Sequence, residues 1–371
     1  MRYIDEFRNK RLIKKIAEKI KSLAPMTTLN IMEVCGTHTQ NFYRFGLDKL
    51  LPSNIKFISG PGCPVCVSPS NYIDSALQLA HNQNVIITTF GDMLRVPGRE
   101  TSLEKIRSKT GNIRIVYSAL DALIIAKQNP GKKVVFLAVG FETTAPTIAQ
   151  TILLAEREKL KNLYFYSSLR LIPAAMEFLL KDKRLKISGF LCPGHVCAII
   201  GTKPYEFIPK RYKIGCCVAG FEPLDILEGI YFLLRQIVGN KPRVQNQYSR
   251  IVTKGGNLRA QRIISRVFKI QDAYWRGLGK IRYSGLGIKR EFSQFDAARH
   301  FSVSSQFSLS GRQRGVLSFQ QKKCRCGEVL KGLITPDKCA LFARGCHPDN
   351  PLGPCMVSSE GTCSAYYKYR R

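Results

Sequence analysis

The chain has 371 residues, of which 44% are hydrophobic and 10% aromatic, a composition that fits a folded protein of two or three domains. It contains no apolar run of about 18 residues, which excludes a membrane-spanning helix, and Met1–Phe7 lacks the apolar core of a signal peptide. We therefore expect a cytoplasmic protein. The net charge of +32 is spread along the chain, since the segment Lys241–Arg314 supplies only +13 of it (16 basic residues less three acidic ones). Without an RNP motif, zinc-finger spacing or basic–aromatic interleaving, this charge favours a basic proteome or an acidic protein partner over nucleic acid.

The first expected element is an amphipathic helix over residues 4–23, ended by Pro25, with isoleucines on one stripe and lysines on the other. Beyond it, β-prone runs alternate with helical patterns, which indicates parallel sheets covered by helices. In such sheets the loops at the carboxyl ends of the strands carry the chemistry. The predicted strands are Leu29–Val34, Ile55–Ile58, Val85–Thr89, Ile113–Tyr117, Val134–Val139, Leu163–Ser167, Ile187–Cys192 and Ile214–Val218, and the predicted helices lie near 71–82, 119–128, 146–160, 173–182 and 223–238.

Similar loop order in the two halves predicts an α/β protein with two Rossmann-like parallel-sheet domains that face each other across a cleft. The first domain is expected over residues 27–118 and the second over 119–239. Residues 240–371 are basic, punctuated by glycine and rich in cysteine, and are predicted to form a third, iron–sulfur domain. The helix within residues 1–26 is expected to pack on that third domain.

Six of the thirteen cysteines lie close to the C-terminus. Cys324, Cys339, Cys346 and Cys363 have the spacing C-x14-C-x6-C-x16-C, and four thiolates suit a [4Fe–4S] cluster or a structural zinc. Zinc sites usually pair their ligands as C-x2-C, a spacing that no pair here has, so we favour the cluster. Cys326 and Cys355 are left over as replacement ligands or redox thiols.

Three further cysteines lie early in the chain. Cys63 and Cys66 form a C-x-x-C motif after Gly60-Pro61-Gly62, which is typical of a redox dithiol or of two metal ligands. Cys35 ends a predicted strand and precedes His38. The sequence leaves open whether His38 is a structural hydrogen-bonding residue or a metal ligand or base. Three soft thiolates at one place would suit low-spin iron or zinc. The alternative is a dithiol with Cys35 as an unrelated core residue.

Other predicted strand ends carry polar groups that could donate hydrogen bonds or protons to a bound anion. His195 is the most promising of these, because the preceding Pro193-Gly194 turn directs its side chain outward. The others are Asp92, Arg95, Glu142, Thr143, Thr144, Glu222 and Asp225.

Several sequence blocks, in order along nearly the whole chain, resemble the HypD family of hydrogenase maturation factors. The matching blocks are Met32–Thr39 (MEVCGTHT), Gly60–Val67 (GPGCPVCV), Thr89–Gly98 (TFGDMLRVPG), Gly140–Pro146 (GFETTAP), Pro193–Val196 (PGHV), Ala219–Pro223 (AGFEP) and Met356–Cys363 (MVSSEGTC).

The resemblance implies a scaffold for assembling the Fe(CN)2CO group of [NiFe]-hydrogenase, with no standard turnover reaction assigned. It implies a small HypC-like chaperone that shares the iron and a HypE-like partner that delivers cyanide as a protein thiocyanate, with a monomer outside that complex and neither nucleic acid nor membrane as partner. Cys35, Cys63 and Cys66 would bind iron and do thiol redox work, and the tail cluster would supply electrons. His195, Glu142 and Glu360 match positions that line the family's cleft.

Two departures from the family pattern stand out. Gln40 replaces a second histidine that is common in the family, and Cys192, Cys197, Cys216 and Cys217 are extra thiols without an assigned role. Two rival hypotheses remain open. One is an iron–sulfur-dependent thiol/disulfide oxidoreductase, and the other is a nucleic-acid-binding protein with a structural zinc.

Overall fold

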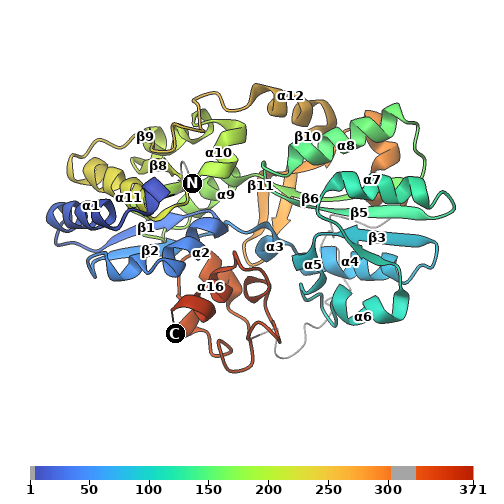
Figure 1. Cartoon of the computed structure of the whole chain (residues 1–371), viewed down its shortest axis with the longest axis horizontal. Coiled ribbons are helices and arrows are strands. Elements are labelled where there is room, and N and C mark those ends of the chain that lie inside the picture. Colours follow the sequence, from blue (N-terminus) through green and yellow to red (C-terminus); the bar gives the residue numbers. More distant parts are fainter. Residues whose placement is uncertain (1–4, 302–322, 371) are drawn as a thin grey trace.

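The computed structural model describes residues 5–301 and 323–370, which form two separate sheets and a C-terminal segment (Figure 1). The first sheet has the order β2-β1-β7-β8-β9 and is parallel throughout. Its strands are β1 (Leu29–Glu33), β2 (Ile55–Ser59), β7 (Gly189–Pro193), β8 (Gly215–Ala219) and β9 (Val244–Asn246).

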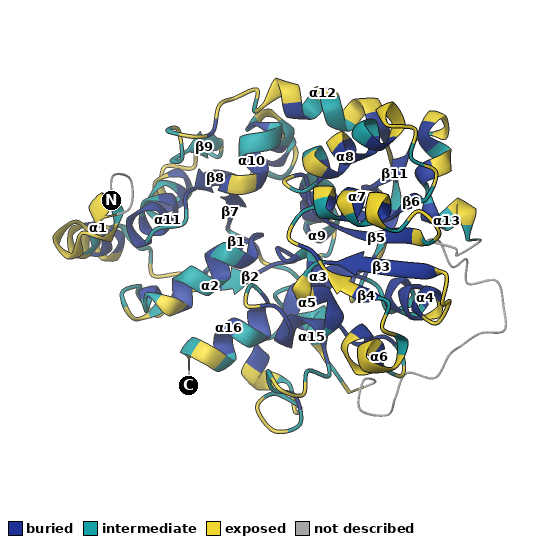
Figure 2. Cartoon of the chain, turned by 45° about the vertical axis from the view of Figure 1, so that its right-hand side comes forward, coloured by how far each residue is buried: buried dark blue, intermediate teal, exposed yellow. Residues whose placement is uncertain are grey.

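The second sheet has the order β10-β11-β6-β5-β3-β4, and is parallel except for the β10–β11 hairpin, which pairs antiparallel with β6. Its central strands are buried on both faces, as expected for parallel strands covered by helices (Figure 2). The strands are β3 (Val85–Thr89), β4 (Ile113–Ile115), β5 (Lys133–Gly140), β6 (Leu163–Arg170), β10 (Phe268–Trp275) and β11 (Gly279–Ile288).

The helices pack on both sheets and begin at recognisable caps. Asn9 caps α1 by accepting from the backbone N–H groups of Arg11 and Leu12, and Glu222 with Asp225 forms a capping box on α11. The helices are α1 (Lys10–Leu23), α2 (Gly36–Arg44), α3 (Pro64–Val67), α4 (Ser70–Ala80), α5 (Gly91–Leu94), α6 (Leu103–Thr110), α7 (Ala119–Gln128), α8 (Ala145–Arg157), α9 (Ile172–Leu180), α10 (Gly194–Ile200), α11 (Pro223–Val238), α12 (Leu258–Val267), α13 (Ala297–His300), α15 (Cys326–Leu330) and α16 (Thr362–Tyr369).

The expected α/β class with mainly parallel sheets is confirmed, and the predicted strands and helices lie where the sequence placed them within a few residues. The predicted division between residues 118 and 119 does not follow the sheets. The first sheet combines β1 and β2 with β7, β8 and β9, and the second sheet is built from strands that lie between and after them. The chain therefore crosses from one sheet to the other and back, a pattern that local periodicity does not reveal.

The region after residue 240 also differs from the prediction. Strand β9 joins the first sheet and the β10–β11 hairpin joins the second, so the separate C-terminal segment comprises only residues 323–370 of those described. Helix α1 packs on α11 of the first sheet, where Ile16 and Ile20 share a core with Leu227. Among the described residues, the expected packing of residues 1–26 on residues 240–371 is represented by Phe7, whose ring lies under the Arg250 guanidinium. In the described part of the chain, no helix combines the length and apolar character needed to cross a bilayer.

Candidate functional site

The carboxyl end of the first sheet brings together four loops that follow β1, β2, β7 and β8. The strand order changes direction between β1 and β7, because β1 leads outward to β2 while β7 leads outward to β8. In open α/β sheets such a switch point is where ligands bind. Cys35 follows β1 and His195 follows β7, which are neighbouring strands of this sheet. The two residues therefore lie at the edge of one sheet, whereas the sequence predicted them in two different domains.

Backbone contacts hold the Cys35 loop directly against the Cys63 loop. The N–H of Gly36 donates to the carbonyl of Gly62 at 2.9 Å. A Cβ atom at Gly62 would lie only 2.2 Å from the Cys35 nitrogen, so only glycine allows the two loops to approach this closely. The Gly-Pro-Gly block thus sets the spacing between the first cysteine and the C-x-x-C motif.

Two carboxyl groups lie beside Cys35, whose side chain is buried. The Glu33 carboxylate accepts from the Cys35 N–H at 2.6 Å and also from the Thr39 hydroxyl. The hydroxyl of Thr37 donates to Glu360 of the C-terminal segment at 2.6 Å. Burial, Glu360 and Glu33 together raise the pKa of the Cys35 thiol to about 12, so the thiol is protonated at neutral pH when no cation is bound. Burial also raises the pKa of Glu33, to about 8.

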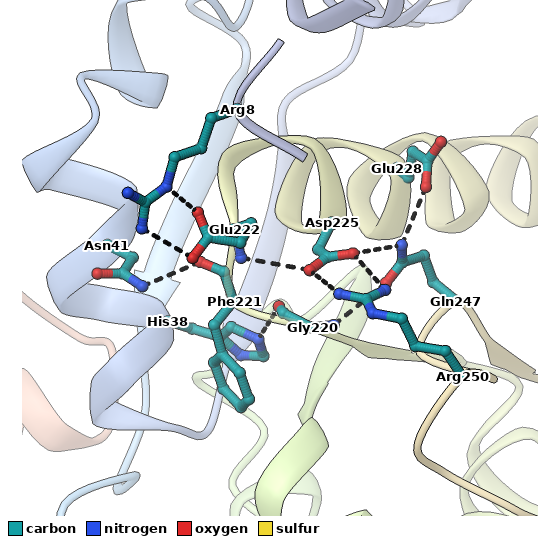
Figure 3. A network of polar contacts seen from close by, with 10 residues as sticks. All are labelled: Arg8, His38, Asn41, Gly220, Phe221, Glu222, Asp225, Glu228, Gln247 and Arg250. Atoms are coloured by element: carbon teal, nitrogen blue, oxygen red, sulfur yellow. Dashed lines mark hydrogen bonds and ion pairs between the residues drawn. The ribbon is translucent and has the colours of Figure 1, made fainter. Parts of the chain in front are cut away.

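Two histidines sandwich the ring of Phe221, which follows β8. The ring centroid of Phe221 lies 3.9 Å from that of His195 and 4.8 Å from that of His38. His38 Nε2 lies 2.8 Å from the carbonyl of Gly220, which fixes Nε2 as the protonated nitrogen because a carbonyl can only accept (Figure 3). Its Nδ1 has no hydrogen-bond partner among the described residues. Burial lowers the pKa of His38 to about 4 and also lowers that of His195, so both rings are neutral near pH 7.

A polar network anchors the loop that carries Phe221 (Figure 3). The buried carboxylate of Asp225 accepts two hydrogen bonds from Arg250, at 2.8 and 2.6 Å, and a third from Gln247 at 2.8 Å. Gln247 also accepts from the Gly220 N–H, and Asn41 donates to the carbonyl of Phe221. These contacts fix the backbone on which the His38–Phe221–His195 stack depends.

Glu142 reaches the same region from the second sheet, where it follows β5. Its Oε1 accepts from the Ile172 N–H at 2.9 Å, and its Oε2 has no partner within the described residues. Burial raises the pKa of Glu142 to about 8. Burial also raises the pKa of the Cys197 thiol, to which the charges of Cys192, Glu142 and Cys35 add.

Helix α3 carries Cys66 to the point where both sheets meet the C-terminal segment (Figure 1). It contacts β5 of the second sheet and the turn Pro354–Met356. The Cys63 sulfur accepts from the Cys66 N–H at 3.3 Å, and the Cys66 thiol donates to the carbonyl of Pro354 at 3.8 Å. The Cys66 thiol also interacts with the thiol of Cys355, so the C-x-x-C motif touches the C-terminal cysteines.

The C-terminal cysteines surround a small cavity with apolar walls. All four predicted cluster ligands line it, with Cys326 as a fifth thiol. The sulfur atoms of Cys324 and Cys326 lie 3.1 Å apart. The thiol of Cys355 interacts with those of Cys326 and Cys363, and also with that of Cys66. Four convergent thiols in an apolar cavity are a donor set that fits a [4Fe–4S] cluster. Over residues 5–301 and 323–370, no three His, Cys, Asp or Glu side chains are already arranged around a metal-sized point. The cavity lining consists of Cys324, Cys326, Val329, Cys339, Leu341, Phe342, Cys346, Met356 and Cys363.

The predicted site residues thus fall into three places. Cys35, Cys63, Cys66, His195 and Glu360 gather at the carboxyl end of the first sheet, Glu142 approaches from the second, and the four predicted cluster ligands line the C-terminal cavity.

The sequence prediction missed two residues of the site, Glu33 and Phe221, and left the role of His38 open. Glu33 was read only as a strand residue, although its place two residues before Cys35 puts it on the same face of the chain. Phe221 and the unpaired nitrogen of His38 become significant only once the strand order is known.

Comparison with known proteins supports the family resemblance seen in the sequence, over nearly the whole chain. A family model described as "HypD: Hydrogenase formation hypA family" matches residues 10–370. Hydrogenase maturation factor HypD of Escherichia coli strain K12 is 43% identical over 379 residues, which cover 100% of this chain and 99% of that relative. HypD2 of Bradyrhizobium diazoefficiens is 42% identical over 380 residues, with 100% and 97% covered. HypD of Azotobacter vinelandii is 42% identical over 379 residues, with the same coverage. The chain belongs to the HypD family of hydrogenase maturation factors.

Proposed function

We propose that this protein is the scaffold on which the Fe(CN)2CO group of [NiFe]-hydrogenase is assembled. Iron, as substrate, is held at Cys35 with Cys63 and Cys66, and electrons come from a [4Fe–4S] cluster held by Cys324, Cys339, Cys346 and Cys363. The observation that carries the proposal is the continuous arrangement of thiols, in which Cys35 lies against the Cys63 loop and Cys66 touches Cys355 beside the C-terminal cavity. The protein works in the cytoplasm, as a monomer until it joins a HypC-like chaperone and a HypE-like cyanide donor.

The surroundings of Cys35 favour a metal ligand over a redox nucleophile. Cysteines that attack disulfides have a lowered pKa because cations or a helix N-terminus stabilise their thiolate. Cys35 is itself the N-cap residue of α2. Burial, Glu360 and Glu33 nevertheless raise the pKa of its thiol, outweighing the N–H groups of His38 and Thr37, which lower it. A divalent cation bound here would favour loss of the proton from the Cys35 thiol and also from the Glu33 carboxyl, whose pKa burial raises to about 8.

Neutral histidines and carboxyl groups supply the remaining polar groups. His38 offers Nδ1 as a lone pair, since its Nε2–H is committed to Gly220, and His195 is held in place by its stack on Phe221. The neutral rings add no positive charge to the site, and the free Nδ1 of His38 can accept a hydrogen bond or, on becoming cationic, a proton. A cluster in the C-terminal cavity supplies one electron at a time. Reduction of a Cys63–Cys66 disulfide to two thiols would take two such electrons and two protons. The protons would come from solvent, and an external one-electron reductant would have to resupply the two electrons.

Anaerobic purification with a co-expressed HypC-like chaperone tests the proposal. We expect iron beyond that of the cluster and infrared bands of bound cyanide and carbon monoxide. Cys35→Ala should abolish the bands and keep the brown cluster chromophore. The control is Cys217→Ala, which removes a buried thiol of the same sheet that has no assigned role. Bands that persist in Cys35→Ala would refute the role of Cys35. Disulfide reductase activity that survives in Cys35→Ala, with no bands in wild type, would favour the oxidoreductase.

The electron route has a separate test at Cys355. Cys355→Ser removes the thiol between Cys66 and the cavity but none of the four proposed cluster ligands. We expect the chromophore to remain while photoreduced cluster no longer reduces a Cys63–Cys66 disulfide, as measured by thiol trapping and mass spectrometry. A wild-type rate of disulfide reduction in the variant would show that electrons reach Cys66 by another route.

A further inference from the structure

A groove of about 740 Å3 runs along β2, the edge strand of the first sheet. All five residues of β2 line it, together with residues of α2, of α16 and of the segments 184–187, 332–336 and 338. Figure 1 places β2 at the border of its sheet, beside the C-terminal segment. None of the cysteines lines this groove, so it is distinct from the thiol site.

The outer edge of β2 carries unpaired backbone groups. The bonds from Leu29 N–H to Asn54 and from Gly60 N–H to Glu33 fix the ladder so that residues 56 and 58 point their peptide groups toward β1. The N–H groups of Phe57 and Ser59 and the carbonyl of Phe57 therefore point into the groove. None of them has a backbone partner in the described ranges. Phe57 and Ser59 are only 9% and 6% exposed as whole residues, because the Phe57 ring stacks on Phe42 and the Ser59 hydroxyl lies 3.3 Å from that of Thr39.

The rim of the groove is strongly basic. Five cationic side chains line it against one lining carboxylate, that of Asp48, which lies 3.9 Å from Arg370. Asp182 and Asp337 outside the lining pair with Arg184 and Lys338, so the excess positive charge lies mainly on Lys56 and Lys186. Apolar side chains such as Leu51, Leu185 and Ile334 line the walls between the charges. The five cations are Lys56, Arg184, Lys186, Lys338 and Arg370.

We propose that this groove binds an extended acidic peptide segment of a partner protein, which adds to β2 as a new edge strand. Main-chain hydrogen bonds to Phe57 and Ser59 would hold the segment, alternate side chains would enter the apolar walls, and its acidic residues would meet the basic rim. A strand of five residues spans about 17 Å, a length that a peptide matches and a small metabolite does not. Pairing of two copies through β2 would bring the two basic rims together, so the charge favours an acidic partner.

The first test selects peptides and then alters their backbone. Random decapeptides displayed on phage are selected on the full-length protein, and the best synthetic peptide is measured by fluorescence polarisation. We expect an alternating pattern of acidic and apolar residues. N-methylation of every second peptide amide should weaken binding at least 10-fold, because it removes donors to β2, while methylation of the intervening amides should have little effect. Equal losses at all positions, or none, would overturn strand addition.

Charge reversal on the protein gives a matched comparison. Lys56→Glu/Lys186→Glu changes two exposed groove residues and should weaken peptide binding about 10-fold or more. Lys105→Glu/Lys109→Glu, on the exposed face of α6, makes the same charge change away from the groove and should alter binding less than about 2-fold. Equal effects of the two pairs would refute a specific basic rim. Thermal denaturation of both variants checks that they are folded.

Hydrogen exchange of the unaltered protein locates the peptide. The amides of Phe57 and Ser59 should exchange quickly in the free protein and become protected when the peptide binds. The Ile58 amide, already bonded to β1, should change little. Protection confined to other segments would overturn the proposal. It would also fail if millimolar phosphate or citrate displaced the peptide completely, or if sedimentation showed a dimer that the peptide dissociates, since the site would then take small anions or a second copy.

Discussion

The carboxyl ends of the two sheets share one topology and differ in chemistry. Around their switch points the strand orders are β2-β1-β7-β8 and β4-β3-β5-β6, so each pair of strands occupies an equivalent position. The loops of the first sheet carry Cys35, Cys63 and His195, whereas those of the second carry Phe90, Asp92 and Glu142. The same arrangement of strands therefore provides one edge that carries the proposed thiol site, called the reactive edge below, and one supporting edge. The loop residues make the difference between them.

At the carboxyl end of the second sheet, aromatic side chains pack against one another. Phe141 stacks on Trp275 at 6.0 Å, and Phe90 meets Phe136 edge-on at 5.4 Å. The β10–β11 hairpin of this sheet then supports the thiol region. The Arg276 N–H donates to the carbonyl of Val67 in α3 at 2.8 Å, and Gly277 packs directly on Gly327 of α15. The second sheet thus holds α3 and the C-terminal cysteines against the reactive edge of the first.

The largest stability effect should come from the polar anchor of the first edge. Arg250→Met leaves the fully buried Asp225 carboxylate without its cation and should lower the free energy of unfolding by about 3–5 kcal/mol in urea denaturation. The double variant Asp225→Asn/Arg250→Met removes the charge as well and should recover part of that loss. A loss below about 1 kcal/mol in the single variant would show that the Phe221 loop does not depend on this pair.

The close approach of the two thiol loops should be the next most sensitive feature. Gly62→Ala places a Cβ atom 2.2 Å from the Cys35 nitrogen, and relief of this overlap must push backbone apart. We expect a loss of about 1–3 kcal/mol in unfolding free energy and weaker iron retention. Gly131→Ala is the control, since no atom lies within 4 Å of its Cβ position, and it should change stability by less than about 0.5 kcal/mol. Equal stability of the two variants would contradict the packing argument.

The sequence predicted individual elements better than their partners. Buried runs such as Val85–Thr89 and turns such as Gly60-Pro61-Gly62 leave local signals, and both lie where expected. Which strands share a sheet depends on contacts between distant residues. For this reason β7 could not be assigned to the sheet of β1, and His195 was expected in a different domain from Cys35.

The missed strands and site residues have similar causes. Strand β10 was missed because Lys269, Gln271 and Asp272 interrupt its apolar pattern, which becomes a strand only by pairing with β11. The loops of the candidate site were predictable, but the position of Cys355 was not. Its contact with Cys66 joins residues nearly three hundred positions apart.

The supporting edge offers a pH-dependent comparison through Glu142. Burial raises the pKa of this carboxyl from 4.5 to about 8, so the folded protein retains a proton that the unfolded chain loses between these pH values. The contribution of protonated Glu142 to the free energy of unfolding is therefore complete below about pH 4.5 and is lost as the pH rises through 8. The stability of wild type relative to Glu142→Gln should fall across this range by up to about 1.4 kcal/mol per pH unit.

Urea denaturation at several pH values measures the Glu142 effect. Asp92→Asn, which makes the same chemical change at an exposed position of the same edge, serves as the control and should leave the pH profile of wild type unchanged. If the profile of Glu142→Gln also matched that of wild type, Glu142 would be ionised in the folded protein, and a cation near its unpaired Oε2 would have to be sought.

The smallest expected effect concerns Arg8, which joins the N-terminal turn to the first edge. Its side chain is 47% exposed and donates to the Glu222 carboxylate, with Nη2 at 3.0 Å. Water screens such a pair, so Arg8→Ala should cost less than about 1 kcal/mol in unfolding free energy. Lys127→Ala is matched to it, because Lys127 is also 47% exposed and pairs with Glu158 beside the second sheet. If Arg8→Ala cost much more than Lys127→Ala, the N-terminal turn would be part of the anchor of the Phe221 loop, and the reactive edge would depend on the polar network as far as residue 8.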